Sequence, residues 1–474
     1  MLKKIIIALL IIIAVPVIFF RTYFHRTDLP LLAQLSADSG PILIEHAAVF
    51  TGRPGDKILQ NSNILIKDGK IAQISEKTIT ADGAKKIDAT GKMVIPGLID
   101  SHTHVQMAGA PFSLPALPNM ERNLTAFLYA GVTSVLDMGG DLKVFEKTAA
   151  SLDINKISGP RLFYAGPMLT KKGGHPAAII RLALFWPLSE MAVSSVTREI
   201  EQGTDIEKIV TENIKHGARW TKIMRDDIPL GVPCLDLKDL KKIAEISAKH
   251  NIPVFAHVGT EEDINICLDA GIKYFAHAPN LSTLSDSTIA RMKKANAVVI
   301  ATLAVYDNIN LLSEKKLVFS PMDREIADPR YIEEYLKDQA GKTPPVLIEW
   351  AREALKYQDI KFDNVKKMKK AGITIIAGSD SPNTATTPGS SIHQELELLV
   401  KRCGFTPIEA VAAATSVPSD HYSAIMGNAG YGSIKVGGPA DLVILEKDFR
   451  DNILNTALIN TVIQKGRLVQ RMKP

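Results

Sequence analysis

Two histidines one residue apart, His102 and His104, follow directly on the apolar run from Val94 to Asp100. Alternate residues of an extended strand point to the same face, so such a pair can bring two imidazole nitrogens to one metal ion. A histidine at a strand end is also often held by hydrogen bonds alone, without any ligand. Taken by itself, the pair is therefore compatible with a metal site and with an ordinary buried strand end.

Four further residues that could do chemistry occur in short β-rich runs later in the chain. His257 lies in the run PVFAHV, His277 lies in YFAHAP, and Asp380 ends TIIAGSD. Lys222 lies inside WTKIMR, where we expect its ammonium group to have little access to water. Because a buried ammonium group is costly, this lysine must be paired with an acid or chemically changed.

The roles of these six residues follow from what a pair of metal ions requires. Two divalent ions about 3.5 to 4 Å apart need a bridging anion. A neutral lysine can add CO2 to form a carbamate with two oxygens and a negative charge, so we expect an N6-carboxylated Lys222 as the bridge. The other ligands divide into one group for each ion, His102 with His104 and Asp380, and His257 with His277. These donors suit Zn2+, and they would also accept Mn2+ or Fe2+.

A centre of this kind predicts hydrolysis by a metal-bound hydroxide. Two divalent ions acidify a water between them at neutral pH, and Asp380 could take its proton and pass it to a leaving nitrogen. We therefore expect cleavage of an amide-type C–N bond in a small substrate such as a dipeptide or an N-acyl amino acid. Hydrolysis of a cyclic amide or imide is the alternative reaction. The alternative class is a non-catalytic ligand-binding barrel, which would need neither a bridging lysine nor a base.

The middle of the chain, residues 94–431, alternates short β-rich runs with helix-like stretches, which predicts βα units and a parallel sheet. The eight candidate strands are VIPGLID at Val94, TSVLDMG at Thr133, RLFYAGP at Arg161, WTKIMR at Trp220, PVFAHV at Pro253, YFAHAP at Tyr274, AVVIATL at Ala297 and TIIAGSD at Thr374. They predict a (β/α)8 TIM barrel, whose chemistry lies at the carboxyl ends of its strands. The six candidate residues fall on this rim. The longest interruption, residues 305–361, is charged and helical and could form a lid.

Both ends of the chain are rich in short β-strands. Residues 41–93 contain ILIEHAAVF and NILIKDGKIAQI, with a hairpin expected at Asp68-Gly69. Residues 432–474 have the same texture, with a second hairpin expected at Lys465-Gly466. We therefore predict one small β-sandwich domain assembled from both ends.

Residues 1–40 carry a targeting signal followed by a connector. Lys3 and Lys4 precede the apolar run from Ile5 to Phe20, and small residues suited to a cleavage site do not follow it closely. This predicts an uncleaved transmembrane anchor with the catalytic part on the outer side of the membrane, the periplasm in a bacterium. The alternative is a cleaved signal peptide and a secreted or periplasmic protein.

The composition excludes several other classes of protein. The chain has 474 residues, 46 % of them hydrophobic, and a net charge of +5. That content supports a sizeable core and excludes a disordered chain. The basic run from Lys366 to Lys370 lacks interleaved aromatic residues, so we do not expect nucleic-acid binding. The three cysteines show no CxxC spacing and therefore no disulfide framework or thiolate metal site.

Several motifs together resemble the metal-dependent amidohydrolase superfamily, in particular its imidazolonepropionase-related and prolidase-like branch. They are VIPGLIDSHTHV at residue 94, GVTSVLDMGG at 131, GPRLFYAGPMLTKKGGHP at 159, AGSDSP at 377 and GSIKVGGPADLVIL at 432. The resemblance implies that the six residues above occupy the metal and catalytic positions of binuclear members. Imidazolonepropionases look like single-metal enzymes without the lysine, so Lys222 places this chain nearer the dipeptidases and amide hydrolases.

Two further residues are candidates for substrate binding. His175, in GGHP, matches a loop histidine of that family, and Arg225 could pair with a substrate carboxylate or form a salt bridge with a nearby acid. The segments HVGT after the fifth strand and MRDDIPLGVPCLDL after Lys222 depart from the family pattern. Because both segments lie where the substrate should bind, they leave the identity of the substrate open. The sequence also leaves open whether the protein forms a homo-oligomer.

Overall fold

The computed structural model describes residues 29–114, 116–337 and 345–472. Within them, parallel strands close a barrel formed by β7 (Leu98–Thr103), β8 (Val132–Asp137), β9 (Arg161–Tyr164), β12 (Thr221–Met224), β13 (Val254–His257), β14 (Tyr274–Phe275), β15 (Val298–Ile300) and β16 (Thr374–Ile376). The amide of Arg219 donates to the carbonyl of Tyr164 at 2.9 Å, which joins the β12 side to β9. The amide of Asp380 donates to the carbonyl of His102 at 2.7 Å, which joins the end of β16 to β7. The predicted eight-stranded barrel is confirmed. The first predicted strand, from Val94, is divided in the structure: its residues 94–96 belong to the sheet of the chain ends, and the barrel strand begins at Leu98.

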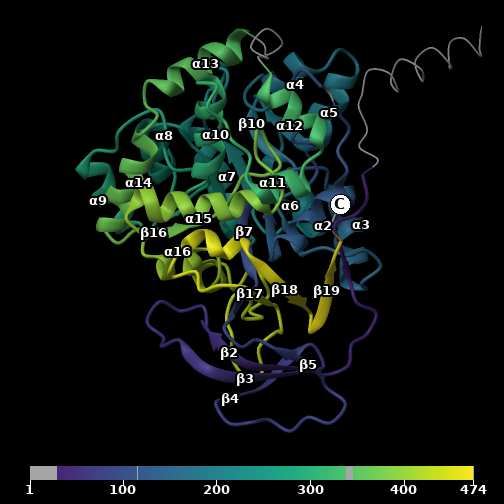
Figure 1. Cartoon of the computed structure of the whole chain (residues 1–474). Helices are drawn as coiled ribbons and strands as arrows, with labels where there is room; N and C mark the ends of the chain where they lie inside the picture. The colour runs from purple at the N-terminus through teal and green to yellow at the C-terminus, as the bar shows by residue number, and fades with distance from the viewer. Residues whose placement is uncertain (1–28, 115, 338–344, 473–474) are drawn as a thin grey trace, which may run out of the picture.

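Helices surround this barrel (Figure 1). Those between or after its strands are α2 (Met120–Tyr129), α3 (Leu142–Asp153), α6 (Ile206–Lys215), α7 (Leu237–Lys249), α8 (Glu261–Asp269), α9 (Asp286–Lys294), α14 (Ile360–Lys370), α15 (Ser390–Cys403), α16 (Pro407–Ala413) and α17 (Ser416–His421). Many start at a residue whose side chain accepts a backbone N–H of the first turn, as Asp141 does for α3 and Thr260 for α8. The capping residues therefore help to determine where each helix begins after its strand.

One excursion from the barrel was not predicted. After β9 the chain forms β10 (Met168–Lys171), α4 (Ala177–Ala183), α5 (Leu188–Val196) and β11 (Thr197–Ile200) before it returns to the barrel. Strand β10 pairs with both β12 and β11, so the sheet extends outward beside the barrel. His175 lies in the loop between β10 and α4, and this excursion therefore sets its position.

The interruption at residues 305–361 is largely helical, as predicted. Its elements are α10 (Leu303–Ser313), α11 (Pro321–Ile326), α12 (Pro329–Leu336) and α13 (Pro345–Leu355). Trp350 and Leu347 of α13 pack with Tyr306 of α10 and with Ile228, which follows β12. These helices therefore contact the loops at the carboxyl end of the barrel, where the candidate residues lie.

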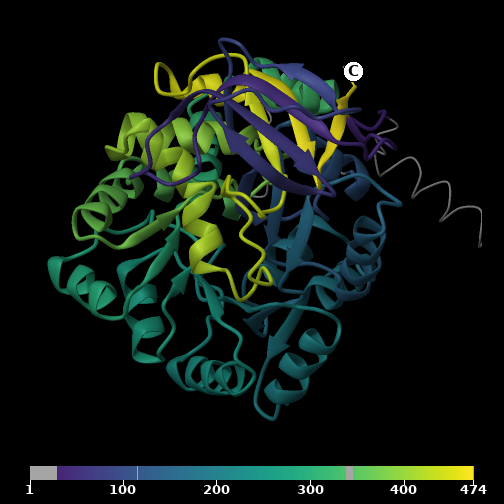
Figure 2. The ribbon, with the colours of Figure 1, turned by 90° about the horizontal axis from the view of Figure 1, so that it is seen from below.

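The two chain ends form one hydrogen-bonded sheet, seen as neighbouring purple and yellow strands (Figure 2). Its members are β1 (Ala33–Leu35), β2 (Ile42–Val49), β3 (Leu59–Lys67), β4 (Lys70–Ser75), β5 (Lys85–Asp88), β6 (Met93–Pro96), β17 (Leu442–Leu445), β18 (Ile459–Gln464) and β19 (Arg467–Arg471). Asp68-Gly69 and Lys465-Gly466 all have positive φ and form the two predicted hairpin turns. A separate apolar core, including Ile44, Ile64 and Ile444, fills the interior of this sheet domain. The 3-10 helix η1 (Ile453–Ala457) connects β17 to β18.

The sheet passes directly into the barrel at Gly97, between β6 and β7. A Cβ added at Gly97 would lie 2.2 Å from Oγ1 of Thr133, so only glycine fits this close approach. In β17, Leu442 and Ile444 pack into the core of the sheet, whereas Val443 joins the core around the barrel. The alternation of a single strand thus ties the two parts together and sets the direction in which β7 enters the barrel.

The predicted anchor from Ile5 to Phe20 lies outside the described residues. In the part of the chain that is described, none of the helices has both the length and the apolar character needed to cross a membrane. Within the predicted connector, Ala33–Leu35 pairs with β19 as an edge strand, so the sheet begins earlier than the expected boundary at residue 41.

Candidate metal centre

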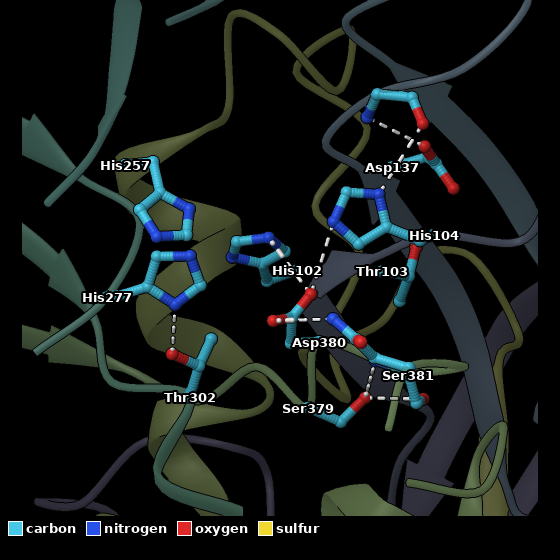
Figure 3. A network of polar contacts seen from close by, with 12 residues as sticks. His102, Thr103, His104, Asp137, His257, His277, Thr302, Ser379, Asp380 and Ser381 are labelled. Atoms are coloured by element: carbon cyan, nitrogen blue, oxygen red, sulfur yellow. Dashed lines mark hydrogen bonds and ion pairs between the residues drawn. The ribbon is translucent and has the colours of Figure 1, made fainter. Parts of the chain in front are cut away.

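The six residues predicted as metal ligands come from five strands or strand ends of one barrel, and Figure 3 shows five of them around a common space. Oδ1 of Asp380 is 3.4 Å from Nε2 of His102 and 3.2 Å from Nε2 of His104. The ring of His277 lies 4.7 Å from that of His102 and 4.0 Å from that of His257, centroid to centroid. The barrel therefore brings together side chains that are up to 278 residues apart in sequence.

Several possible ligand atoms in this space have no hydrogen-bond partner in the described part of the protein. They are Nδ1 and Nε2 of His102, Nε2 of His277 and Oδ1 of Asp380, and all are buried. One ligand atom from each of these three residues lies within 4.8 Å of the others. Unpaired buried polar atoms are costly, so a cluster of them needs an explanation. Two imidazoles and a carboxylate around one space are the donors of a Zn2+ or similar site, and the residues therefore fit a divalent ion.

The tautomer of His277 follows from its contact with Thr302. Oγ1 of Thr302 donates its only hydrogen to the carbonyl of Ala301 at 2.9 Å and lies 2.7 Å from Nδ1 of His277. Because the hydroxyl has no second hydrogen to give, Nδ1 of His277 must carry the proton. Nε2 then presents its lone pair to the shared space, as a metal ligand requires.

We expect Thr302→Val to weaken metal binding about 10- to 100-fold, because a hydrogen-bond partner that orients a metal-ligating histidine typically contributes that much. Valine keeps the size of the threonine but cannot accept from Nδ1 of His277. The dissociation constant for Zn2+, measured by competition with a chelator, checks this. Thr302→Ser keeps the hydroxyl and serves as the control, and equal Zn2+ affinity in Thr302→Val and Thr302→Ser would contradict the role of the hydroxyl.

A second cluster adjoins the first through His257 and includes a residue that sequence reasoning missed. Asp226 lies two residues beyond β12, with both carboxylate oxygens 2.9 Å from Nδ1 of His175 and Oδ2 3.2 Å from Nε2 of His257. Burial would raise the pKa of Asp226, but the adjacent charges and hydrogen bonds of the two histidines outweigh it and hold that pKa well below its usual range. The carboxylate is therefore ionised and orients both rings.

Lys222 lies in β12 and is only 1 % exposed. Burial lowers its pKa to about 8, against the attraction of Asp380, Asp226 and Asp137. Its Nζ has no hydrogen bond or ion pair with the residues that the structure describes. At pH 7, Lys222 is consequently neutral in about a tenth of the molecules. The neutral amine is the form that can add CO2.

Protonation of the other candidates also matches ligand chemistry. Burial lowers the pKa of His102 and of His277 well below the usual value, so both rings are neutral. For His104, burial lowers the pKa, but the hydrogen bond and charge of Asp380, with the charge of Asp137, raise it above the usual value. Neutral imidazole is the form that binds metal, and a cation in the centre would displace the proton from His104.

Two further buried carboxylates position the centre, and neither was among the predicted site residues. Asp100 in β7 accepts from the amide of Ser379 at 2.9 Å, and Asp137 accepts from the amide of Val105. Burial raises the pKa of Asp100 to about 7 and that of Asp137 to about 6. These bonds connect the segments that carry His102, His104 and Asp380, so they hold the ligands in register.

Arg225 does not join this cluster of donors. Its Nη1 lies 3.1 Å from Oδ1 of Asp263, at the start of α8, and its side chain is largely buried. His175, the other predicted substrate contact, is brought to the centre through Asp226. The structure thus places His175 beside the proposed ligands, whereas Arg225 is paired with Asp263 at the start of α8.

Glu395 of α15 supports the same site from behind. Its Oε2 accepts from the amide of Ala304 at 2.8 Å, in the first turn of α10, and the side chain is completely buried. Thr302 begins that helix without a side-chain capping bond, because its hydroxyl is committed to His277. Glu395 therefore supplies the cap that Thr302 does not, and α10 carries Tyr306, whose ring lies against His277 at a centroid distance of 5.4 Å.

Glu395→Gln is expected to flatten the dependence of stability on pH. Burial raises the pKa of Glu395 from 4.5 to about 8, so the folded protein retains a proton that the unfolded chain loses as pH rises through 4.5. The stabilisation that this retained proton gives the folded protein is complete below pH 4.5 and is lost as the pH rises to about 8. It decreases by about 1.4 kcal/mol per pH unit over that range. In denaturant unfolding at pH 5, 6, 7 and 8, the free energy of unfolding of Glu395→Gln should rise progressively relative to that of the wild type. A difference between the two proteins that is constant with pH would contradict the assignment.

Comparisons with known proteins agree with this geometry. The model of the family described as "Amidohydrolase family" matches residues 93–469. An ochratoxinase from Aspergillus niger is 25 % identical over 421 residues, covering 80 % of this chain and 76 % of that protein. An imidazolonepropionase from Geobacillus sp. is 24 % identical over 473 residues, covering 95 % of this chain and 98 % of that protein.

The fold has relatives among solved structures. A putative prolidase from Bifidobacterium longum aligns with a TM-score of 0.71 at 24 % identity, over 92 % of this chain and 96 % of that one. At this level of identity the likeness concerns the fold. It agrees with the closed barrel and the sheet built from both chain ends.

Proposed function

The chain belongs to the amidohydrolase family and is a metal-dependent hydrolase of carbon–nitrogen bonds, and we propose that its substrate is a linear amide of the dipeptide or N-acyl amino acid type. The observation that carries this proposal is Lys222, buried beside the histidine cluster with a depressed pKa and no partner among the described residues. A carboxylated Lys222 would bridge two divalent ions, probed first as Zn2+. The resemblance to binuclear members implies such a bridge, whereas the single-metal imidazolonepropionases look different at this position.

The residues proposed to hold the ions are those that surround the shared space. His102, His104 and Asp380 would bind one ion, His257 and His277 the other, and carboxylated Lys222 both. Bound ions would supply Lewis acidity, which acidifies a water and polarises the scissile carbonyl.

Asp380 is proposed as the catalytic base. Its Oδ2 accepts a hydrogen bond from Nδ2 of Asn383 at 3.3 Å, whereas Oδ1 faces Nε2 of His102 and His104 without a hydrogen bond. Oδ1 would take a proton from the attacking water and return it to the leaving nitrogen, so that the amine departs neutral. The buried surroundings keep other water away from that proton.

His175 is proposed to bind the substrate. Asp226 accepts from its Nδ1, so the ring is held in one orientation next to His257. Its Nε2 then remains as an acceptor for an N–H group of the substrate. For Arg225 a substrate contact would require a carboxylate to compete with Asp263 for the guanidinium.

Two measurements test the proposed function. Elemental analysis after reconstitution with Zn2+ and bicarbonate should give about two ions per chain. A panel of dipeptides and N-acyl amino acids should be hydrolysed faster than lactams and hydantoins of similar size. Less than one ion per chain would exclude the mechanism, and a preference for the cyclic compounds would favour the alternative reaction.

We also propose that the N-terminal segment anchors the protein with its hydrolase domain outside the membrane. Lys3 and Lys4 before the apolar run from Ile5 to Phe20 support this orientation. Protease added to intact cells with a permeabilised outer layer should digest the hydrolase domain, and full protection would contradict the orientation.

A further inference from the structure

A small cavity lies next to two of the segments that carry the proposed metal ligands. It has a volume of about 40 Å3, enough for two or three waters or one small anion. Its wall includes Gly109, five residues after His104, and Pro382, two residues after Asp380. The first turn of α2 and helix α12 complete it.

Arg122, in the first turn of α2, lines this cavity with an unsatisfied guanidinium. The residue is 6 % exposed, and its Nε is buried without a partner. Over the described residues, its guanidinium makes no hydrogen bond or ion pair. Burial lowers the pKa of Arg122 from 12.5, yet an arginine stays charged at any physiological pH. A buried and unpaired cation is among the most costly groups in a protein.

The nearest acid does not balance this charge. Asp328 also lines the cavity and attracts Arg122, but its carboxylate accepts two bonds from the guanidinium of Arg330, at 3.0 and 2.8 Å. It also accepts from the amide of Arg330 as the cap of α12. Asp328 thus directs its carboxylate to Arg330, and Arg122 keeps an Nε without a hydrogen-bond partner. The amino-terminal end of α2 adds a further positive potential there.

We propose that this cavity is an anion-binding site centred on Arg122, which takes a carboxylate or a monovalent inorganic anion of similar size. The bound anion would accept a hydrogen bond from Nε of Arg122 and offset the charge of its guanidinium. It would also brace the segment after His104, because Nδ2 of the adjacent Asn123 already holds the carbonyls of Val105 and Met107. The anion could be the carboxylate of the substrate, which rests on the proposed function, or a free anion, which does not.

The first experiment uses acetate as the probe and thermal unfolding of the full-length protein as the readout. Sodium acetate replaces sodium gluconate, whose anion is too large for the cavity, at constant ionic strength. Acetate should raise the Tm of the wild type and not that of Arg122→Met. In gluconate alone, Arg122→Met should be at least as stable as the wild type, because it no longer buries an unpaired charge.

Arg471→Met is the matched control. Arg471 is a mostly buried arginine that bonds the carbonyl of Tyr129, at the opposite end of α2 from Arg122. It removes the same charge without touching the cavity, so its response to acetate should equal that of the wild type. An equal response in Arg122→Met, or none in the wild type, would overturn the proposal.

Should Arg122→Met fail to fold, Arg122→Lys replaces it and should bind acetate at least fivefold more weakly, since lysine lacks the bidentate fork. Unchanged acetate affinity in Arg122→Lys would also overturn the site.

The second experiment identifies the source of the anion. In Arg122→Met, the KM for an N-acyl amino acid should rise at least tenfold while the KM for its C-terminal carboxamide stays the same, if the substrate carboxylate occupies the cavity. If the thermal response is lost but both KM values are unchanged, the cavity binds a free anion. If no amide is hydrolysed at all, the proposed function fails while the acetate experiment still decides the site.

Discussion

Lys222→Ala is expected to abolish hydrolysis and to reduce the metal content from about two ions per chain to less than one. The bridge is the shared ligand of both ions in our proposal, and alanine has neither the stem nor the charge to replace it. Elemental analysis and initial rates with an N-acyl amino acid would measure both effects. Propionate added to the variant should restore part of the activity, because it supplies a free carboxylate to the vacated space.

A second buried lysine provides the control for this variant. Lys361 is 1 % exposed like Lys222, but its Nζ donates to the carbonyl of Gln358 at 2.6 Å, and no predicted ligand contacts it. Lys361→Ala should therefore lower stability and leave the metal content unchanged. Full activity in Lys222→Ala, or equal metal loss in both variants, would show that the lysine is not a bridge.

Asp380→Asn is expected to retain much of the metal while losing about 10²- to 10⁴-fold in kcat, the usual contribution of a general base. Asparagine has the same shape, and its amide oxygen can still face His102 and His104, but it cannot take a proton. The measurement is kcat at saturating substrate, together with elemental analysis of the same preparation.

Asn383→Ala is the matched control for this second variant. It removes the 3.3 Å hydrogen bond to Oδ2 of Asp380 and the 2.7 Å bond that Oδ1 of Asn383 accepts from the amide of Thr384. The carboxylate itself remains, so kcat should fall less than tenfold. A comparable loss in both variants would mean that the carboxylate acts through its position and not as a base. Normal turnover by Asp380→Asn would show that Asp380 is not the catalytic base.

Local patterns of the sequence determine much of this fold. The eight barrel strands and the two hairpin turns follow from hydrophobic period and turn residues, which act over a few positions. The clustering of the proposed ligands was also predictable, because a parallel barrel brings all carboxyl strand ends to one rim. Once the strands were assigned, His102, His257 and Asp380 had to meet there.

The contacts that tune the site were not accessible in the same way. Asp226 reaches His175 across 51 residues, Thr302 reaches His277 across 25, and Glu395 reaches the start of α10 across 91. Each depends on how helices and loops pack against the barrel. Neither β10 nor β11 was predicted, so the position of His175 could not be derived either.

The sequence by itself determined which side chains face the centre, because strand alternation and strand order depend on local chemistry that every parallel barrel shares. Only the tertiary structure decided which ring nitrogens have hydrogen-bond partners, that Arg225 pairs with Asp263, and that Nε of Arg122 is buried without a hydrogen-bond partner. These properties arise from side chains that approach within about 3 Å after packing, since a hydrogen bond or an ion pair depends on distances that sequence spacing does not encode.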